Sequence, residues 1–175
     1  LRREIGERYA AEGLVAASAG MRRVMELVDI VTATDSAILI QGESGTGKEL
    51  VARAIHFRGA RAGRPFIAIN CAALVDSLLE AELFGIEERT ATGVRGRRGK
   101  FEMADGGTLF LDEVSDLSAP AQAKLLRAIQ DLTVERVGSA MPRRVDARLV
   151  AATNQGLAGQ VARRDFREDL YYRLA

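Results

Sequence analysis

Gly42-Glu43-Ser44-Gly45-Thr46-Gly47-Lys48 is the stretch that decides the fold of this 175-residue chain. It follows a short apolar run, Ala37-Ile38-Leu39-Ile40, and it leads into a helical pattern from Lys48 to about His56. Strand, glycine turn and helix in this order fit the pattern G-x-x-x-x-G-K, whose backbone N–H groups turn towards a polyphosphate. The positive end of the helix dipole points to the same place, and Lys48 would reach the β- and γ-phosphates. The alternative is an ordinary glycine turn, but the flanking strand and helix favour phosphate binding.

Glu49 stands where this pattern normally carries the Ser or Thr whose hydroxyl contacts Mg²⁺. A carboxylate can hold a magnesium-bound water but cannot reproduce the short hydroxyl contact. Metal binding must therefore depend more on another residue. The run 106–113 ends an apolar strand in two acids, Asp112 and Glu113, and open α/β sheets bind ligands at that end of their strands. We expect Asp112 to hold Mg²⁺ and Glu113 to polarise the water that attacks the γ-phosphate. Acids that merely cap the next helix are the alternative, which the phosphate loop upstream disfavours.

Apolar runs alternate with helical patterns along the rest of the chain. Further strands are expected at 65–69, 108–111 and 148–152. Further helices are expected at 21–31, 74–84, 121–132 and 166–174, and the glycine-rich, charged stretch 85–99 is expected to be an exposed loop. Strands that alternate with helices predict an α/β fold in three layers, a parallel sheet covered by helices on both faces.

The composition is that of a globular protein, with 47% hydrophobic and 28% charged residues, and not that of a disordered tail. A formal net charge of +1 argues against a strongly basic nucleic-acid binder, because phosphate neutralisation needs an excess of Lys and Arg. No apolar run has the length of a membrane span, so no membrane partner is expected. The single Cys71 excludes an internal disulfide and fits a reducing compartment, and we expect a cytoplasmic protein.

The ends of the chain suggest a piece of a longer protein. The chain starts at Leu1 instead of Met and stops at Ala175, directly after a helical pattern. Residues 1–13 are charged and helix-favouring and are interpreted as a linker or N-terminal helix, with a frayed terminus as an equal alternative. Residues 14–175 are interpreted as one domain. They contain no recognisable helix-turn-helix, so DNA contact is expected only through domains outside this chain.

Seven stretches together resemble one family. They are QGESGTGKELVARAIH (41–56), PFIAINCAAL (65–74), LLEAELFG (78–85), GKFEMADGGTLFLDEVSDL (99–117), AQAKLLRAIQ (121–130), RLVAATN (148–154) and FREDLYYRL (166–174). All resemble the central ATPase domain of bacterial enhancer-binding proteins, the AAA+ activators of sigma-54 RNA polymerase, in which Glu49 after the lysine is usual. The resemblance implies an AAA+ P-loop NTPase fold, here without the helical lid that completes the nucleotide site. It also implies an ATPase that depends on Mg²⁺, works as an oligomer and remodels the polymerase.

The resemblance extends to individual residues. Asn154 matches the polar sensor that reads the γ-phosphate, and Asn70 matches an asparagine that holds the catalytic glutamate until partners engage, with a turn-capping amide as the alternative. Arg167 and Arg173 match arginines offered to the neighbouring subunit's nucleotide, with a solvated helix face as the alternative. Six residues on an ideal helix correspond to about 240° of rotation, so the two arginines cannot share one face. We expect Arg173 to touch the γ-phosphate and Arg167 to support the interface of a ring, which in this family is usually a hexamer.

One loop departs from the family pattern. The polymerase-contacting loop of the family usually reads Gly-Ala-Phe-Thr-Gly-Ala, whereas the aligned stretch here is Arg89-Thr90-Ala91-Thr92-Gly93-Val94. Ala91 replaces an aromatic residue, and exposed aromatics are typical anchors of protein contacts. Two functions therefore remain open: a motor domain that remodels sigma-54 polymerase, and an ATP-binding regulatory module of the same fold that oligomerises without engaging sigma-54.

Overall fold

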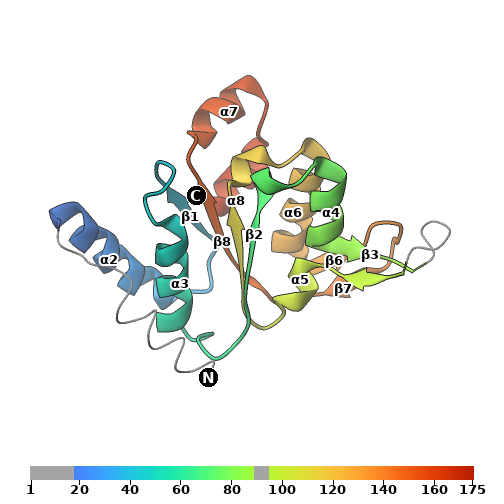
Figure 1. Cartoon of the computed structure of the whole chain (residues 1–175), viewed down its shortest axis with the longest axis horizontal. Coiled ribbons are helices and arrows are strands. Elements are labelled where there is room, and N and C mark those ends of the chain that lie inside the picture. The colour runs from blue at the N-terminus through green and yellow to red at the C-terminus, as the bar shows by residue number, and fades with distance from the viewer. Residues whose placement is uncertain (1–17, 89–94) are drawn as a thin grey trace.

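The centre of the fold is a four-stranded sheet in which every neighbouring pair of strands is parallel (Figure 1). The computed structural model describes residues 18–88 and 95–175. The sheet has the order β1-β8-β5-β2, with β1 at Ile38–Gln41, β8 at Arg148–Thr153, β5 at Thr108–Asp112 and β2 at Phe66–Asn70. The two central strands are apolar runs with almost no exposed residue, as strands buried on both faces require. The predicted parallel sheet is confirmed.

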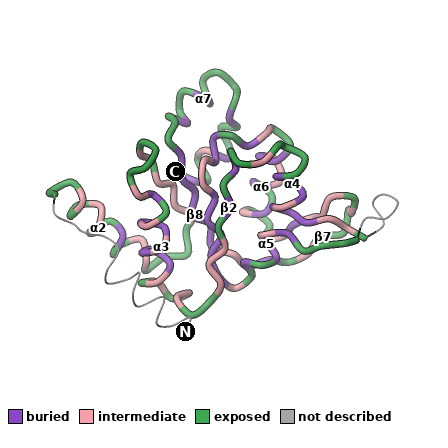
Figure 2. Tube along the Cα trace, viewed as in Figure 1, coloured by how far each residue is buried: buried purple, intermediate pink, exposed green. Residues whose placement is uncertain are grey.

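Helices cover both faces of this sheet (Figure 1). On one face lie α2 (Ala19–Thr32) and α3 (Lys48–Arg58); on the other lie α4 (Asp76–Phe84), α5 (Lys100–Met103), α6 (Ala119–Asp131) and α8 (Glu168–Leu174). Strand β5 shows both layers, because Leu109 and Leu111 pack in the larger core while Phe110 packs with Val28 and Ile55 in the smaller one. The buried positions accordingly run through the middle of the molecule (Figure 2). The three-layer prediction is confirmed.

Short elements complete the described part of the chain. A two-stranded hairpin joins β3 (Gly85–Ile86) to β4 (Arg97–Arg98), so the prediction of 85–99 as loop throughout is wrong at its two ends. A second hairpin pairs β6 (Thr133–Glu135) with β7 (Pro142–Arg144). The remaining elements are α7 (Leu157–Arg163) and two 3₁₀ turns, η1 (Cys71–Ala73) and η2 (Val114–Asp116). No helix within 18–88 and 95–175 is both long and apolar enough to cross a bilayer.

The strand register brings the ends of the four strands to one edge of the sheet. Asn70 is the Cα partner of Asp112, and Gln41 is the Cα partner of Thr153. The amide of Gly42 donates a hydrogen bond to the carbonyl of Thr153 over 3.2 Å, which ties the glycine turn to the end of β8. Polar residues that follow these strands therefore share one edge, as the sequence predicted.

Candidate functional site

The glycine turn between β1 and α3 has a backbone that only glycine adopts readily. Gly45 has a φ of 78° and Gly47 a φ of 87°, both in the left-handed region. Gly47 is the N-cap of α3, so the helix begins at Lys48 and its first N–H groups have no partner within the helix. Free N–H groups and the positive end of a helix dipole at one place suit an anion such as a phosphate.

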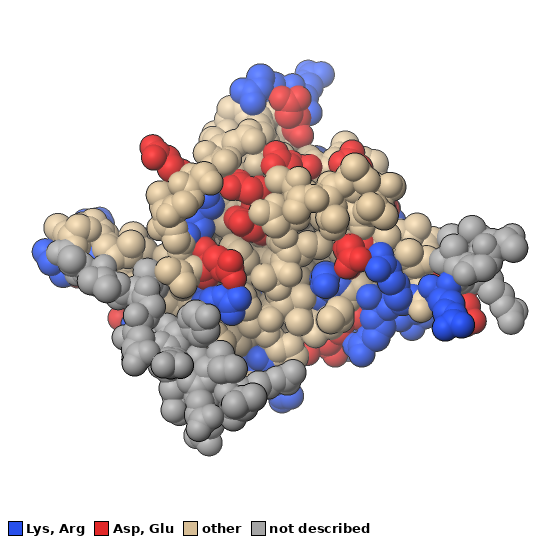
Figure 3. All heavy atoms as spheres, viewed as in Figure 1, with Lys and Arg blue, Asp and Glu red and all other residues tan. Residues whose placement is uncertain are grey.

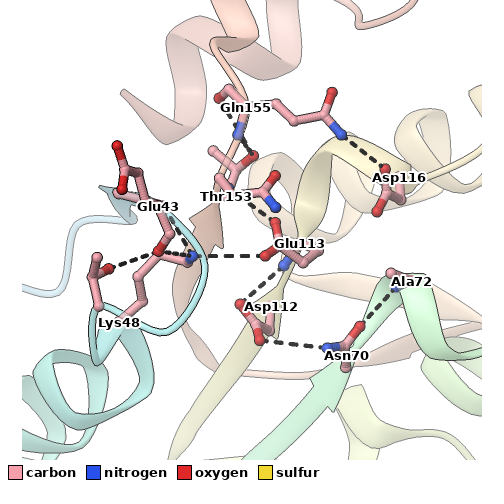
Figure 4. Close-up of polar contacts among 12 residues, drawn as sticks. Glu43, Lys48, Asn70, Ala72, Asp112, Glu113, Asp116, Thr153 and Gln155 are labelled. Carbon is pink, nitrogen blue, oxygen red and sulfur yellow. Dashed lines mark hydrogen bonds and ion pairs between the residues drawn. The ribbon is translucent and has the colours of Figure 1, made fainter.

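Lys48 connects this turn to the carboxyl edge of the sheet (Figure 4). Its side chain is 8% exposed, and its Nζ donates hydrogen bonds to the carbonyls of Gly42 (2.9 Å) and Glu43 (3.1 Å). The same Nζ lies 3.6 Å from Oε1 of Glu113. The hydroxyl of Thr46 also donates to the Glu43 carbonyl, over 2.8 Å. The ammonium group is thus held by the loop's own carbonyls and by one carboxylate, and a phosphate bound in the loop would replace these contacts.

Two carboxylates leave β5 in different directions. Asp112 is the last residue of the strand, and Glu113 follows with φ 53° and ψ 52°, a left-handed conformation that is rare for residues other than glycine. The Asp112 carboxylate faces Asn70, whereas that of Glu113 faces Lys48 (Figure 4). Backbone strain of this kind concentrates at functional sites. The sequence carries no signal for this turn, because glutamate has no preference for the left-handed region.

Negative charge accumulates at this edge. Burial, followed by the charge of Glu113, raises the pKa of Asp112 above its ordinary value, and the same two causes raise the pKa of Asp116. Burial and then these carboxylates raise the pKa of Cys71 to about 12, so its thiol stays protonated. Figure 3 shows several Asp and Glu side chains over the central part of the face of the molecule that it presents. A cation bound here would relieve the repulsion between the carboxylates.

The donor set fits a magnesium ion that arrives with phosphate ligands. Within the described ranges, no three Asp, Glu, His or Cys side chains converge to hold a metal. Mg²⁺ is usually bound by one or two carboxylates together with substrate phosphates and waters, so Asp112 suffices on the protein side. Glu49 is engaged elsewhere, since Nε and Nη2 of Arg53 donate to its Oε1 over 2.9 and 2.7 Å.

The two asparagines lie on either side of the carboxylates. Asn70 donates from Nδ2 to Oδ2 of Asp112 over 3.5 Å, and its Oδ1 accepts from the amide of Ala72 over 2.9 Å. It therefore contacts Asp112 instead of Glu113 in this structure, and it also caps the turn η1, the alternative that the sequence left open. The backbone amide of Asn154 donates to Oε2 of Glu113 over 2.9 Å, while Asn154 itself is exposed.

The two arginines near α8 differ in their surroundings. Arg167 is the N-cap of the helix with an extended backbone, and its guanidinium donates to both carboxylate oxygens of Asp169 over 3.0 and 2.7 Å. The expected helix from 166 therefore begins only at Glu168, and the 240° rotation does not apply to Arg167. Arg173 lies exposed in the last turn, and its side chain has no ion pair or side-chain hydrogen bond within the described residues. Of this pair, Arg173 is the arginine that remains available to a partner.

The predicted polymerase-contacting loop, Arg89–Val94, lies outside the described residues. Ion pairs hold the strand β4 next to it: Nη1 of Arg97 lies 2.8 Å from Oε1 of Glu82, and Nε of Arg98 lies 3.8 Å from Oε2 of Glu102. Glu102 also accepts hydrogen bonds from Arg136 over 2.7 and 2.9 Å. The amide of Val137 also donates to the Gly85 carbonyl over 2.9 Å, which joins the two hairpins. Lys and Arg side chains gather over this part of the face (Figure 3).

The chain matches the Sigma-54 interaction domain over residues 14–175. It belongs to this family. It is 51% identical over 175 residues to a Nif-specific regulatory protein of Enterobacter agglomerans, and 55% identical over 163 residues to the transcriptional regulatory protein ZraR of Klebsiella oxytoca. These matches cover 99% and 93% of this chain but only 34% and 37% of the relatives, so the chain spans about a third of their length.

Solved structures agree with the family. NtrX from Brucella abortus in complex with ATP superposes with a TM-score of 0.88 at 41% sequence identity, covering 99% of this chain and 37% of that one. The complex of NtrX with ADP gives 0.87 at 40% identity, covering 98% and 37%. The P-loop NTPase domain of a sigma-54 activator from E. coli superposes with a TM-score of 0.55 at 23% identity, covering 86% of this chain and 97% of that one. This likeness supports the fold alone. The predicted P-loop NTPase fold is confirmed.

Proposed function

We propose that this domain binds ATP with Mg²⁺, hydrolyses it, and drives the remodelling of sigma-54 RNA polymerase holoenzyme in the cytoplasm. The observation that carries the proposal is the 3.6 Å approach of Lys48 Nζ, from a phosphate-type loop, to a carboxylate oxygen of Glu113 at the end of β5. Family membership and the ATP complex of the relative NtrX support it.

We assign a role to each part of the site. The backbone of residues 42–49 would hold the phosphates, and Lys48 would exchange the carbonyls of its loop for the β- and γ-phosphate oxygens. Asp112 would hold Mg²⁺, which neutralises charge on the phosphates when it is bound. Glu113 would orient the attacking water and take its proton, and the amide of Asn154 already fixes the Glu113 carboxylate. Asn154 would then sense the γ-phosphate through its exposed side chain.

A complete site requires a second subunit in this proposal. Arg173 has no partner in the described part of its own chain, so we assign it to the nucleotide of a neighbouring subunit, with Arg167 supporting the interface. The surface that offers Arg173 differs from the surface that receives it, so the subunits associate head to tail, and such contacts form a ring when the rotation between subunits closes. We propose a ring of six subunits. Residues 14–175 form the motor core and residues 1–13 a linker, while DNA is reached through other parts of the protein.

Replacing Lys48 with alanine is expected to weaken ATP binding. A hydrogen bond to a charged group contributes about 1.5–3 kcal/mol, so the Kd for ATP should rise roughly 10- to 150-fold. Titration calorimetry on the full-length protein measures this change. Lys100→Ala is the matched control, because it also removes a lysine but one outside the phosphate loop. Nζ of Lys100 lies 3.7 Å from Oε2 of Glu82. Equal affinities of Lys48→Ala and wild type would contradict the assignment.

The altered loop is expected to weaken contact with sigma-54. The pair of changes Ala91→Phe and Arg89→Gly restores an apolar tip and the backbone freedom of glycine. We expect the double variant to co-elute with sigma-54 more strongly than wild type when a transition-state analogue of ATP is bound. Adding Lys48→Ala to the double variant supplies the control, because it should abolish nucleotide-dependent co-elution. Strong co-elution of the wild type would show that Ala91 and Arg89 are competent in this contact.

A further inference from the structure

Gln122 on α6 is a buried amide that holds two other segments of the chain, one at Leu117 and one at 165–167. The residue is 1% exposed. Its Nε2 donates to the carbonyl of Leu117 over 2.8 Å and to that of Asp165 over 3.0 Å, and its Oε1 accepts from the amide of Arg167 over 2.8 Å. Both N–H donors and the oxygen of the side chain are therefore used, and every partner is a backbone group.

The partners of Gln122 lie in two segments, each next to residues that the proposed reaction uses. Leu117 directly follows η2, the turn that leaves the Asp112–Glu113 pair. Asp165 and Arg167 lead into α8, the helix that carries Arg173. The side chain of Arg167, the N-cap of α8, makes no capping hydrogen bond to the backbone of the helix. The oxygen of Gln122 therefore fixes the backbone at the point where this helix starts.

A second set of contacts links the start of α8 to the residues that follow β8. The amide of Asp165 donates to the Gln160 carbonyl over 2.9 Å, and Nε2 of Gln160 donates to Oε1 of Gln155 over 2.6 Å. Gln155 in turn donates to Oδ1 of Asp116 over 3.4 Å (Figure 4). The start of α8 is thus linked to the segment after Glu113 both directly, through Gln122, and through the residue that follows Asn154.

We propose that Gln122 is a positioning residue that sets the place of α8, and with it Arg173, relative to the loop that follows Glu113. This inference rests on the proposed use of Arg173 at a neighbouring nucleotide. Leu170 and Leu174 are buried in the core, so α8 is packed along its length and a shift at its start moves the whole helix. Gln122 touches no reacting atom. It serves the subunit that donates the arginine, not the subunit that holds the nucleotide.

The first test is hydrogen exchange in the peptide that covers α8, measured by mass spectrometry on the full-length protein. Gln122→Met keeps a side chain of similar length and removes the amide, so exchange at the start of α8 should become faster. Gln130→Met is the matched control, because Gln130 is an exposed residue of the same helix. Equal exchange in wild type and Gln122→Met would overturn the proposal. Should Gln122→Met not accumulate as folded protein, Gln122→Glu retains the acceptor for the Arg167 amide and loses the two donors.

The second test separates the donor subunit from the acceptor subunit. Lys48→Ala subunits, which keep Arg173, are mixed with Arg173→Ala subunits, which keep the nucleotide site, and phosphate release is measured. A displacement of about 1 Å costs a catalytic group about 10²-fold, so adding Gln122→Met to the Lys48→Ala donor should lower the recovered turnover about 100-fold. Adding it to the Arg173→Ala acceptor should leave the recovery intact, as should Gln130→Met on the donor.

The outcomes of the mixing test are distinct. If Gln122→Met abolishes the recovered turnover on the donor subunit and on the acceptor subunit alike, Gln122 is a general structural residue and its assignment to the donor subunit is overturned. If the turnover is fully recovered with Gln122→Met on either subunit, the assignment is overturned as well. Absence of recovery in the mixture without any change at Gln122 would instead refute the cross-subunit role of Arg173, and with it the use that we assign to Gln122.

Discussion

Replacing Arg173 with alanine is expected to lower the rate of ATP hydrolysis by about 10³–10⁵-fold, the effect of an arginine supplied to the transition state of phosphoryl transfer. Arg173 is exposed on the last turn of α8 and has no side-chain partner in the described chain, so its removal leaves no buried group unpaired. The fold and the affinity for ATP should therefore change little. Phosphate release and calorimetric ATP binding, measured on the same preparation, separate the two effects.

Arg167→Ala is the control for this prediction. The guanidinium of Arg167 is already held by Asp169 through two hydrogen bonds, so we expect a smaller loss of turnover than for Arg173→Ala. The reverse order would assign the transition-state contact to Arg167. Turnover of Arg173→Ala at the wild-type level would remove this residue from the site altogether.

Changing Glu113 to glutamine is expected to reduce turnover by about 10²–10⁴-fold, which is the usual contribution of a positioned general base. The substitution keeps the shape of the side chain and its contact with the Asn154 amide, but the neutral amide takes up a proton poorly. ATP should still bind, because Lys48 and the glycine turn remain unchanged. Single-turnover hydrolysis and equilibrium ATP binding provide the two readouts.

Asp116→Asn is a suitable comparison for Glu113→Gln. Asp116 lies on the same edge, and burial and the charge of Glu113 raise its pKa, yet its carboxylate is held by Gln155. Loss of this carboxylate should spare most of the turnover. Comparable rates for Glu113→Gln and wild type would mean that another group activates the water.

The sequence predicted those features that depend on local pattern. The glycines of the phosphate loop and the apolar runs before residues 42 and 112 carry physical signals over a few residues, and the strands formed there as expected. The pairing of β2 with β5, which places Asn70 beside Asp112, was not predicted, because the order of the strands in the sheet depends on contacts between distant residues. The alternation of strands and helices did predict that the site lies at the carboxyl edge of the sheet.

Other features depend on contacts between distant residues. The three hydrogen bonds of Gln122 include two to residues 43 and 45 positions away, and no periodicity in α6 marks this side chain as different from any buried glutamine. The two-residue strands β3 and β4 are too short to show alternation, and both residues of β4 are arginines, which favoured a loop. The separate surroundings of Arg167 and Arg173 likewise follow from where α8 starts, which the helical pattern placed two residues too early.

The action of Arg173 across a subunit interface can be measured as phosphate release by an equal mixture of Lys48→Ala and Arg173→Ala full-length subunits. Each variant alone should be nearly inactive, one for lack of a phosphate ligand and the other for lack of the arginine. If subunits assemble at random into a ring of identical interfaces, about a quarter of these interfaces combine an intact nucleotide site with an intact Arg173. We expect the mixture to recover a substantial share of wild-type turnover. Turnover equal to the average of the two separate variants would show that Arg173 does not act across a subunit interface.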